Sequence, residues 1–262
     1  MSDFRRPTDL NDPCLKEIRV LKTGTLTLDL WAGADLAVKL DNNATVAVKE
    51  IKTHVPKDRR RFEIQGTAFG NAWLNAYRDQ LPWVCPLQVV VPRPPSKDDF
   101  IQKLKNEGTS VALKYRLPVS IMIAQAILES NAGGSNLALL DNILFGITKR
   151  SELWKGKEHD WYPAAKRIGR YKTVAIAGQK AVDDLFCAAD SYAQAVEIWA
   201  QYVTRHPHTK NPQTLFTGAP WTDAKRQAIA DLMPKLMFGV GSKNYPQEIM
   251  TVIRENGLAA YD

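Results

Sequence analysis

Residues 121–147 of this 262-residue chain read IMIAQAILESNAGGSNLALLDNILFGI. The first part has apolar residues at helical spacing and carries one carboxylate, Glu129, at its tail. Residues 130–135 form a loop of small residues, and a second apolar run follows, interrupted by Asp141 and Asn142. Any functional interpretation has to explain why a charged residue ends a helix that is otherwise apolar.

The hydrophobic period changes near residue 100, which predicts two domains. Residues 15–91 alternate with a period of two, as in TLTLDL at 25–30, and contain about seven short segments of this kind. This pattern predicts an all-β sandwich of the immunoglobulin-like type. Residues 1–14 are expected to form an irregular arm, and 92–99 (PRPPSKDD) a stiff linker. The remaining residues, 100–262, show mainly helical spacing.

The charge and the termini restrict the partners only weakly. The formal net charge is +7, and the excess is spread over both parts of the chain. It is compatible with cell-wall polymer, nucleic acid or a membrane surface. No groove-reading motif supports nucleic-acid binding, and no apolar run reaches the roughly 20 residues of a membrane span. The N-terminus MSDFRRPTDLNDPC lacks the apolar segment of a secretory signal. We therefore expect synthesis in the cytoplasm and export by other machinery if the substrate lies outside.

The cysteines and histidines predict no metal site and no cofactor. Cys14, Cys85 and Cys187 are too few and too scattered for a zinc site or a disulfide framework, although a Cys14–Cys85 bridge stays open. His206 and His208 form an H-x-H pair with no further ligands nearby. We expect both histidines to be exposed to solvent.

Glu129 is the candidate general acid. The negative end of its helix lies close by, and its neighbours are apolar, so the ionised carboxylate is disfavoured. A carboxyl group with a raised pKa can protonate the leaving oxygen when a glycosidic bond breaks. Gln125 lies one turn earlier and is expected to hydrogen-bond the substrate or Glu129. The alternative is a solvated glutamate with no function.

Several ordered segments resemble the glucosaminidase family of bacterial cell-wall hydrolases, glycoside hydrolase family 73. They are QAILES at 125–130, Asn142 followed by LFGI at 144–147, WKGK at 154–157, DSY at 190–192, and the C-terminal part from 239 to 262. The resemblance covers roughly residues 98–262 and implies a lysozyme-like fold, mainly helical with a small β-lobe. The implied substrate is the glycan of peptidoglycan, and the implied role of Glu129 is general acid. The implied substrate-binding residues are Gln125, Ser130, Asn142, Phe145, Trp154, Tyr192 and Tyr245. Asn142 and Phe145 would shape the floor of the cleft, and the other aromatic residues would stack on sugar faces. Core packing is the alternative for each aromatic residue.

A second carboxylate is expected, because retaining and inverting glycosidases both normally use one. Glu158 or Asp160, just after WKGK, is the predicted residue. Other candidates are Glu152, Asp183 and Asp184. Assistance by the N-acetyl group of the substrate, or a water-free lytic reaction, would replace the second carboxylate.

Three positions depart from the family pattern. The small-residue loop has Ala132 where a tryptophan is usual, Ile143 replaces the second asparagine, and Val240 replaces a tyrosine. These departures keep a non-catalytic wall-binding module open as an alternative.

A wall-degrading domain without a visible signal peptide suggests an antibacterial effector of a type VI secretion system. Such a protein would act in the periplasm of a target bacterium. We expect an immunity protein that blocks the cleft, and a secretion component bound by the β-sandwich. A phage lysis or tail-associated muramidase or lytic transglycosylase is the alternative.

Overall fold

The computed structural model describes residues 8–9, 17–31, 37–40, 45–51, 59–77, 87–148, 167–173, 182–206, 208–209, 215–236, 238–239 and 242–262. The chain divides into two compact units. The β unit comprises Met1–Arg93 with Arg170–Lys172, and the helical unit comprises Pro94–Gly169 with Thr173–Asp262. The change between Arg93 and Pro94 falls inside the stretch predicted as a linker.

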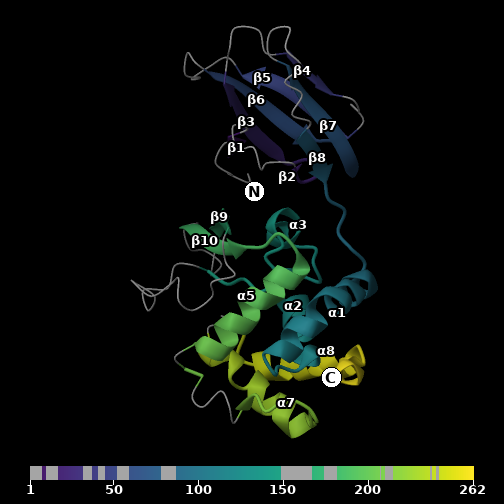
Figure 1. The fold of residues 1–262 in the computed structure, drawn as a ribbon, viewed down its shortest axis with the longest axis vertical. Coiled ribbons are helices and arrows are strands. Elements are labelled where there is room, and N and C mark those ends of the chain that lie inside the picture. The colour runs from purple at the N-terminus through teal and green to yellow at the C-terminus, as the bar shows by residue number, and fades with distance from the viewer. Residues whose placement is uncertain are drawn as a thin grey trace. The chain divides into compact units, whose positions relative to one another are not determined.

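The β unit contains two four-stranded sheets (Figure 1). One has the order β1-β3-β6-β5 and the other the order β2-β8-β7-β4. The two central pairs, β3 with β6 and β7 with β8, are antiparallel, whereas β1–β3 and β2–β8 are parallel. The strands are β1 Thr8–Asp9, β2 Glu17–Arg19, β3 Thr25–Trp31, β4 Ala37–Leu40, β5 Val46–Ile51, β6 Arg59–Gly66, β7 Gly70–Tyr77 and β8 Leu87–Val91.

Both sheets contribute to one apolar core. Leu26 and Ile64 come from the first sheet, and Leu74 and Val89 from the second, and all four are buried. Along each strand, every second side chain points toward the opposite sheet, as expected for a sandwich. The all-β prediction for this unit therefore agrees with the structure, and the immunoglobulin-like type stays a prediction.

Every helix that the structure describes lies in the helical unit (Figure 1). The two-stranded sheet of β9 and β10 belongs to it as well, except for Arg170–Lys172 of β9, which are grouped with the β unit. The prediction of a mainly helical unit with a small β-lobe is confirmed. The elements are α1 Lys97–Lys114, α2 Val119–Ser130, α3 Asn136–Asp141, β9 Arg167–Thr173, β10 Val182–Ala188, α5 Tyr192–Arg205, α7 Asp223–Ala230, η2 Met233–Leu236, α8 Tyr245–Glu255 and η3 Leu258–Tyr261. Within the described part of the chain, no helix is long and apolar enough to cross a membrane.

Helix α1 begins inside the predicted linker, at Lys97. The side chain of Ser96 accepts a hydrogen bond from the Asp99 N–H at 3.1 Å and caps the helix. Asp98 and Asp99 place negative charge in the first turn, where the helix dipole favours it. These local signals explain why the helix starts three residues before the predicted boundary.

Helix α2 is the central element of the helical unit. Every residue from 119 to 127 is buried, and so is Ser130, whereas Leu128 and Glu129 are only partly buried. α2 contacts α1, α8 and η3. Glu129 therefore stands where a fully buried helix reaches the edge of the core.

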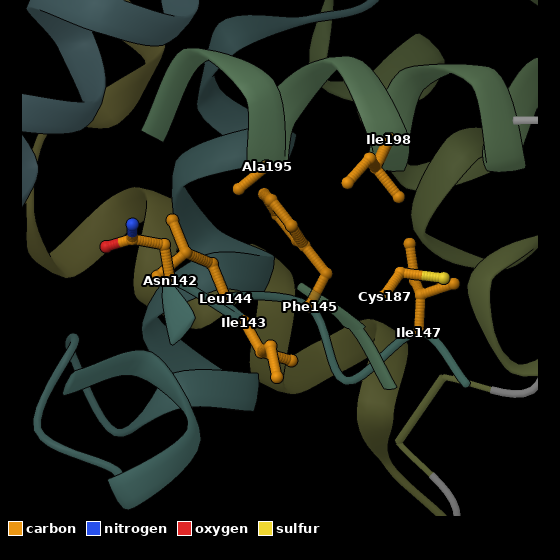
Figure 2. A pocket seen from close by; sticks show the side chains of 8 residues that line it. All are labelled: Asn142, Ile143, Leu144, Phe145, Ile147, Cys187, Ala195 and Ile198. Atoms are coloured by element: carbon orange, nitrogen blue, oxygen red, sulfur yellow. The ribbon is translucent and has the colours of Figure 1, made fainter. Parts of the chain in front are cut away.

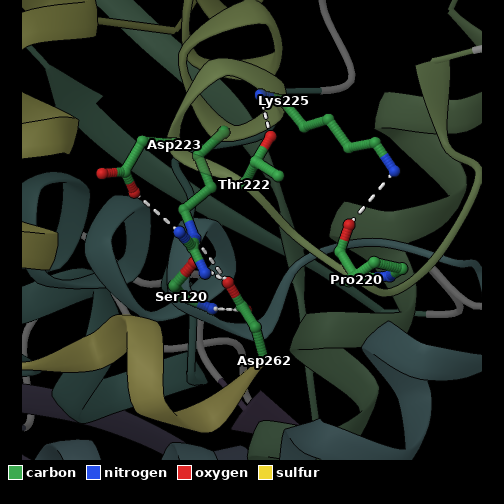
Figure 3. A network of polar contacts seen from close by, with 7 residues as sticks. Ser120, Pro220, Thr222, Asp223, Lys225 and Asp262 are labelled. Atoms are coloured by element: carbon green, nitrogen blue, oxygen red, sulfur yellow. Dashed lines mark hydrogen bonds and ion pairs between the residues drawn. The ribbon is translucent and has the colours of Figure 1, made fainter.

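The N-terminus of α2 is held by the carboxylate of Asp262 (Figure 3). Asp262 accepts hydrogen bonds from the Ser120 N–H at 2.8 Å and the Ser120 hydroxyl at 2.7 Å. The Arg226 Nε donates to the same carboxylate at 2.7 Å, and the other end of that guanidinium meets Asp223. Pro118 supplies no side-chain cap, so Asp262 provides the negative charge that the helix start favours.

Candidate active site

The chain turns sharply after Glu129. Asn131, Ala132 and Gly133 have φ angles of +52°, +50° and +78°. A Cβ on Gly133 would lie 2.5 Å from the Phe100 ring, so this position requires glycine. The sharp turn ends α2 immediately after the carboxylate.

Ser130 holds this turn together. Its hydroxyl donates to the Ala126 carbonyl at 2.5 Å and accepts from the Gly133 N–H at 2.8 Å. The side chain is fully buried. Ser130 therefore supports the loop from inside, instead of making the substrate contact predicted for it.

One oxygen of Glu129 is held by two donors. The Tyr245 hydroxyl donates to Oε1 at 2.5 Å, and the Gly239 N–H donates to the same atom at 3.1 Å. Oε2 accepts no hydrogen bond from the residues that the structure describes, and it lies 3.7 Å from the place where a Cβ on Gly146 would be. The carboxyl group is thus fixed through Oε1 and keeps Oε2 available.

Burial raises the pKa of Glu129 above its ordinary value of 4.5. The hydrogen bonds from Tyr245 and Gly239 act against this, because they stabilise the ionised form, but burial is the larger effect. The predicted direction from the sequence is the same. A carboxyl group of this kind keeps its proton to higher pH, as a general acid requires.

The raised pKa predicts a pH-dependent stability difference. Stability linked to Glu129 is fully present below pH 4.5 and is lost as the pH rises through the raised folded-state pKa. Glu129→Gln has no such proton to lose, so we expect the variant to be more stable than the wild type at pH 7 and equal to it below pH 4.5. Urea unfolding across this pH range measures the difference. A difference that stays constant with pH would contradict the account.

Gly239 is required by the close approach of Tyr245. A Cβ at this position would lie 2.2 Å from the tyrosine ring, and the φ angle is +62°. We expect Gly239→Ala to lower the free energy of unfolding by about 1–3 kcal/mol through overpacking, and to displace Tyr245 from Glu129. Gly257→Ala is the matched control, because Gly257 has φ +59° with nothing within 4 Å of its added Cβ. If the two variants lose the same free energy of unfolding and the same rate of glycan cleavage, the close approach of Tyr245 to Gly239 is unimportant.

Tyr245 has a different role from the predicted sugar stacking. It lies at the start of α8, its side chain is 3% exposed, and its hydroxyl contacts Glu129. Burial and the neighbouring Glu129 raise the pKa of Tyr245 well above its ordinary value, so the phenol keeps its proton. Tyr245 is therefore a hydrogen-bond donor to the acid.

Gln125 also acts from inside the core. It is fully buried, its Oε1 accepts from the Trp199 Nε1–H at 2.9 Å, and its Nε2 lies 3.4 Å from the Tyr245 hydroxyl. A fully buried amide cannot touch a polymer substrate. The predicted hydrogen bond to Glu129 is not present, because Gln125 bonds Tyr245 and Trp199 instead.

The other predicted substrate-binding residues described by the structure are also buried. Asn142 ends α3 with φ +49°, and its Nδ2 donates to the Ala189 carbonyl at 3.0 Å. The Phe145 ring stacks on Trp199 with centroids 5.4 Å apart. Tyr192 lies at the first turn of α5 and packs edge-on against Phe100 of α1. For these aromatic residues the core alternative describes the observed packing.

Several predicted residues lie outside the described part. Trp154, Glu158, Asp160 and the alternative Glu152 all fall between residues 149 and 166, and Val240 is outside as well. The backbones of Asp183 and Asp184 belong to β10, but their side chains are not described. The second carboxylate therefore stays a prediction.

A small pocket beside the site is mainly apolar (Figure 2). It is lined by Asn142, Ile143, Leu144, Phe145, Ile147, Cys187, Ala195 and Ile198. Glu129 is not part of this lining. Ile143, which stands where the resemblance implies a second asparagine, contributes to its apolar wall.

The histidine pair does not form a metal site in the described residues, which contain no group of three potential ligands. His206 is 3% exposed, so the expectation that it is solvent-exposed was wrong, whereas His208 is exposed. Burial lowers the pKa of His206 to about 4, which keeps the imidazole neutral. The charge of the neighbouring His208 lowers the pKa of His206 as well, and the imidazole ring of His206 packs against Tyr202 with ring centroids 5.2 Å apart. Cys187 is a buried thiol.

Sequence reasoning did not identify Trp199 or Gly239 as site residues. A usable signal was present for Trp199, because an indole N–H on a buried helix face needs an acceptor, and Gln125 on α2 needs partners for the same reason. For Gly239 no local signal identifies its contact with a residue 110 positions away.

The comparisons with known proteins concern mainly the helical unit. Residues 105–258 match the Glucosaminidase family, described as mannosyl-glycoprotein endo-β-N-acetylglucosaminidase. No curated protein sequence matches the chain. The catalytic domain of the autolysin Auto from Listeria monocytogenes is similar at 22% identity and a TM-score of 0.48, over 66% of this chain and 91% of that one. A peptidoglycan hydrolase from Sphingomonas sp. A1 is similar at 24% identity and a TM-score of 0.45, over 62% and 91%. The glycoside hydrolase domain of FlgJ from Salmonella typhimurium is similar at 19% identity and a TM-score of 0.44, over 63% and 91%.

Proposed function

The chain belongs to the glucosaminidase family, whose match covers more than half of its length, and from this premise we propose that it cuts the glycan of peptidoglycan. The choice of peptidoglycan is supported by the ordered segments that resemble the cell-wall members, from QAILES at 125–130 to LFGI at 144–147. The proposed bond lies next to an N-acetylglucosamine unit, as in the activity that names the family.

The observation that carries the proposal is the environment of Glu129. A partly buried carboxyl group with a raised pKa stands at the end of a buried helix, inside the family-matched segment. Two donors satisfy Oε1, so the proton of the neutral acid belongs on Oε2. Oε2 lies beside Gly146, which has no side chain that could cover this oxygen.

In the proposed reaction the C1–O bond of the glycan breaks while the proton of Oε2 moves to the leaving oxygen. The electron pair of the broken bond stays with that oxygen, which leaves as a hydroxyl group. Glu129 becomes a carboxylate, and its negative charge is stabilised by the donors Tyr245 and Gly239. The same two groups therefore position the acid before the reaction and stabilise its ionised form afterwards.

For the group that stabilises or attacks the sugar carbon we retain Glu158 or Asp160 as the proposal. The N-acetyl group of the substrate or a water-free lytic route are the alternatives. Hydrolysis gives a reducing sugar end whether a carboxylate or the N-acetyl group assists it, whereas the lytic route gives an anhydro end, so the products separate the lytic route from the other two.

Mass analysis of the fragments released from purified sacculi tests the proposed function. We expect soluble fragments with reducing N-acetylglucosamine ends from the wild type. Reducing muramic ends or anhydro ends would favour the muramidase or lytic alternative instead. Binding to sacculi without release of any fragment would replace the enzyme proposal with the non-catalytic module.

The biological setting is a further part of the proposal. We propose an effector of a type VI secretion system that acts in the periplasm of a target bacterium, with an immunity protein that blocks the site. The separate β unit, proposed to be immunoglobulin-like, would bind a secretion component, since it carries its own core. A lysis or tail protein of a phage is the alternative. Expression with and without a periplasmic leader tests the setting, because growth arrest only with the leader is expected.

A further inference from the structure

The hydrogen bonds that lead to Glu129 have a fixed direction, which follows from the chemistry of one side chain. An indole N–H can only donate, so the atom of Gln125 that faces Trp199 Nε1 at 2.9 Å is an oxygen. The amide nitrogen of Gln125 is then the atom that faces the Tyr245 hydroxyl, at 3.4 Å. That nitrogen also only donates, so the Tyr245 oxygen accepts there and its proton is directed to Glu129 Oε1.

We propose that Trp199 is a positioning residue, which fixes the orientation of the Gln125 amide and thereby directs the Tyr245 proton to Glu129. This inference rests on the proposed function of Glu129 and adds a residue to it. Trp199 does not touch the acid itself, and its effect passes through two side chains. The Phe145 ring stacks on the indole with an interplanar angle of 22° and holds its plane.

Loss of the indole N–H would release the Gln125 amide. The amide could then rotate and present its oxygen to Tyr245, which would give the phenol a second acceptor in competition with Glu129. While the Tyr245 hydroxyl donates to Gln125, it does not donate to Glu129, which then keeps only the Gly239 N–H as a donor. The ionised carboxylate would be less stabilised, so the pKa of Glu129 would rise further.

Other charged groups near this path are few in the described residues. Tyr245 from α8 is the titratable side chain that bonds Glu129, and Gly239 contributes only its backbone. Glu248, also on α8, acts on Tyr245 from a distance and raises its pKa. None of these groups is changed by a substitution at position 199.

The test is a carbon-13 NMR titration of the side-chain carboxyl groups in a glutamate-labelled chain of residues 1–262. The signal of Glu129 is identified by its absence in Glu129→Gln. We expect the titration midpoint to move to higher pH in Trp199→Phe, and to move at least as far in Tyr245→Phe. An unchanged midpoint in Trp199→Phe, together with a changed one in Tyr245→Phe, would overturn the proposal.

A rescue variant separates positioning from a loss of packing. In Trp199→Phe with Gln125→Leu, the competing acceptor is gone, so Tyr245 again donates only to Glu129 and the midpoint should return toward the wild-type value. A cavity effect predicts the opposite, because two core changes perturb the site more than one. Trp221→Phe is the matched control, since the Trp221 N–H is buried without a partner among the described residues, and it should leave the midpoint unchanged.

A measurement on the wild type applies even if Trp199→Phe does not fold. The hydroxyl proton of Tyr245 should give a downfield proton signal that shifts as Glu129 titrates. A hydroxyl signal that does not respond to Glu129 would overturn the proposal. These titrations do not depend on activity, so an inactive wild type would refute the proposed function and leave this inference to be decided separately.

Discussion

Glu129→Gln is expected to lower the rate of glycan cleavage about 10²- to 10⁴-fold, which is the usual contribution of a positioned general acid. The amide oxygen of glutamine can still accept from Tyr245 and Gly239, so the fold and the substrate site should persist. The amide nitrogen at the place of Oε2 has no acidic proton to give. The measurement is the rate of fragment release from purified sacculi under substrate saturation.

Glu255→Gln is the matched control for this substitution. Glu255 lies at the end of α8 and is exposed, so the same change of charge there should leave the rate within twofold of the wild type. The general-acid role would be wrong if Glu129→Gln kept the wild-type rate. An equal loss in both variants would point to a charge effect on substrate attraction instead.

Arg226→Met is expected to lower the free energy of unfolding of the helical unit by about 3–5 kcal/mol, the usual cost of leaving a buried charge without its partner. The side chains of Arg226 and Asp262 are only 8% and 3% exposed, and their atoms are 2.7 Å apart. Without the guanidinium, Asp262 would keep only the two donors from Ser120. Urea unfolding followed by the far-ultraviolet circular dichroism signal of the helices measures the loss, because the described helices all lie in the helical unit.

Asp223→Asn provides the control on the other side of the same arginine. Asp223 also bonds Arg226 at 2.7 Å, but its side chain is 85% exposed, so its removal should cost less than about 1 kcal/mol. Equal losses for Arg226→Met and Asp223→Asn would contradict the importance of the buried pair. Asp262→Asn should behave like Arg226→Met, because it breaks the same contact from the other side.

Local signals in the sequence were sufficient for the main elements. The change of period near residue 100 predicted an all-β part followed by a helical part, and the apolar spacing before Glu129 predicted α2. The position of Glu129 after this apolar face also predicted the raised pKa, since both burial and the helix end follow from the neighbouring residues.

The roles of individual side chains depended on distant contacts that the sequence does not reveal. Tyr245 lies 116 residues from Glu129, and an aromatic residue at a helix start gives no sign of whether it meets a sugar or an acid. Asp262 is joined to Ser120 across 142 residues, and its neighbours along the chain carry no sign of this contact. Ser130 was predicted to contact the glycan, and Gln125 to contact the glycan or Glu129, whereas both side chains are fully buried and bond neighbouring groups of the protein.

A crystal structure of Glu129→Gln with a bound peptidoglycan fragment tests the central claim most directly. We expect the glycosidic oxygen of the fragment to lie within hydrogen-bond reach, about 2.6–3.2 Å, of the side-chain atom that replaces Oε2. Tyr245 and Gly239 should still hold the other atom of that side chain. A fragment bound in the helical unit with its glycosidic oxygens out of reach of residue 129 would contradict the account.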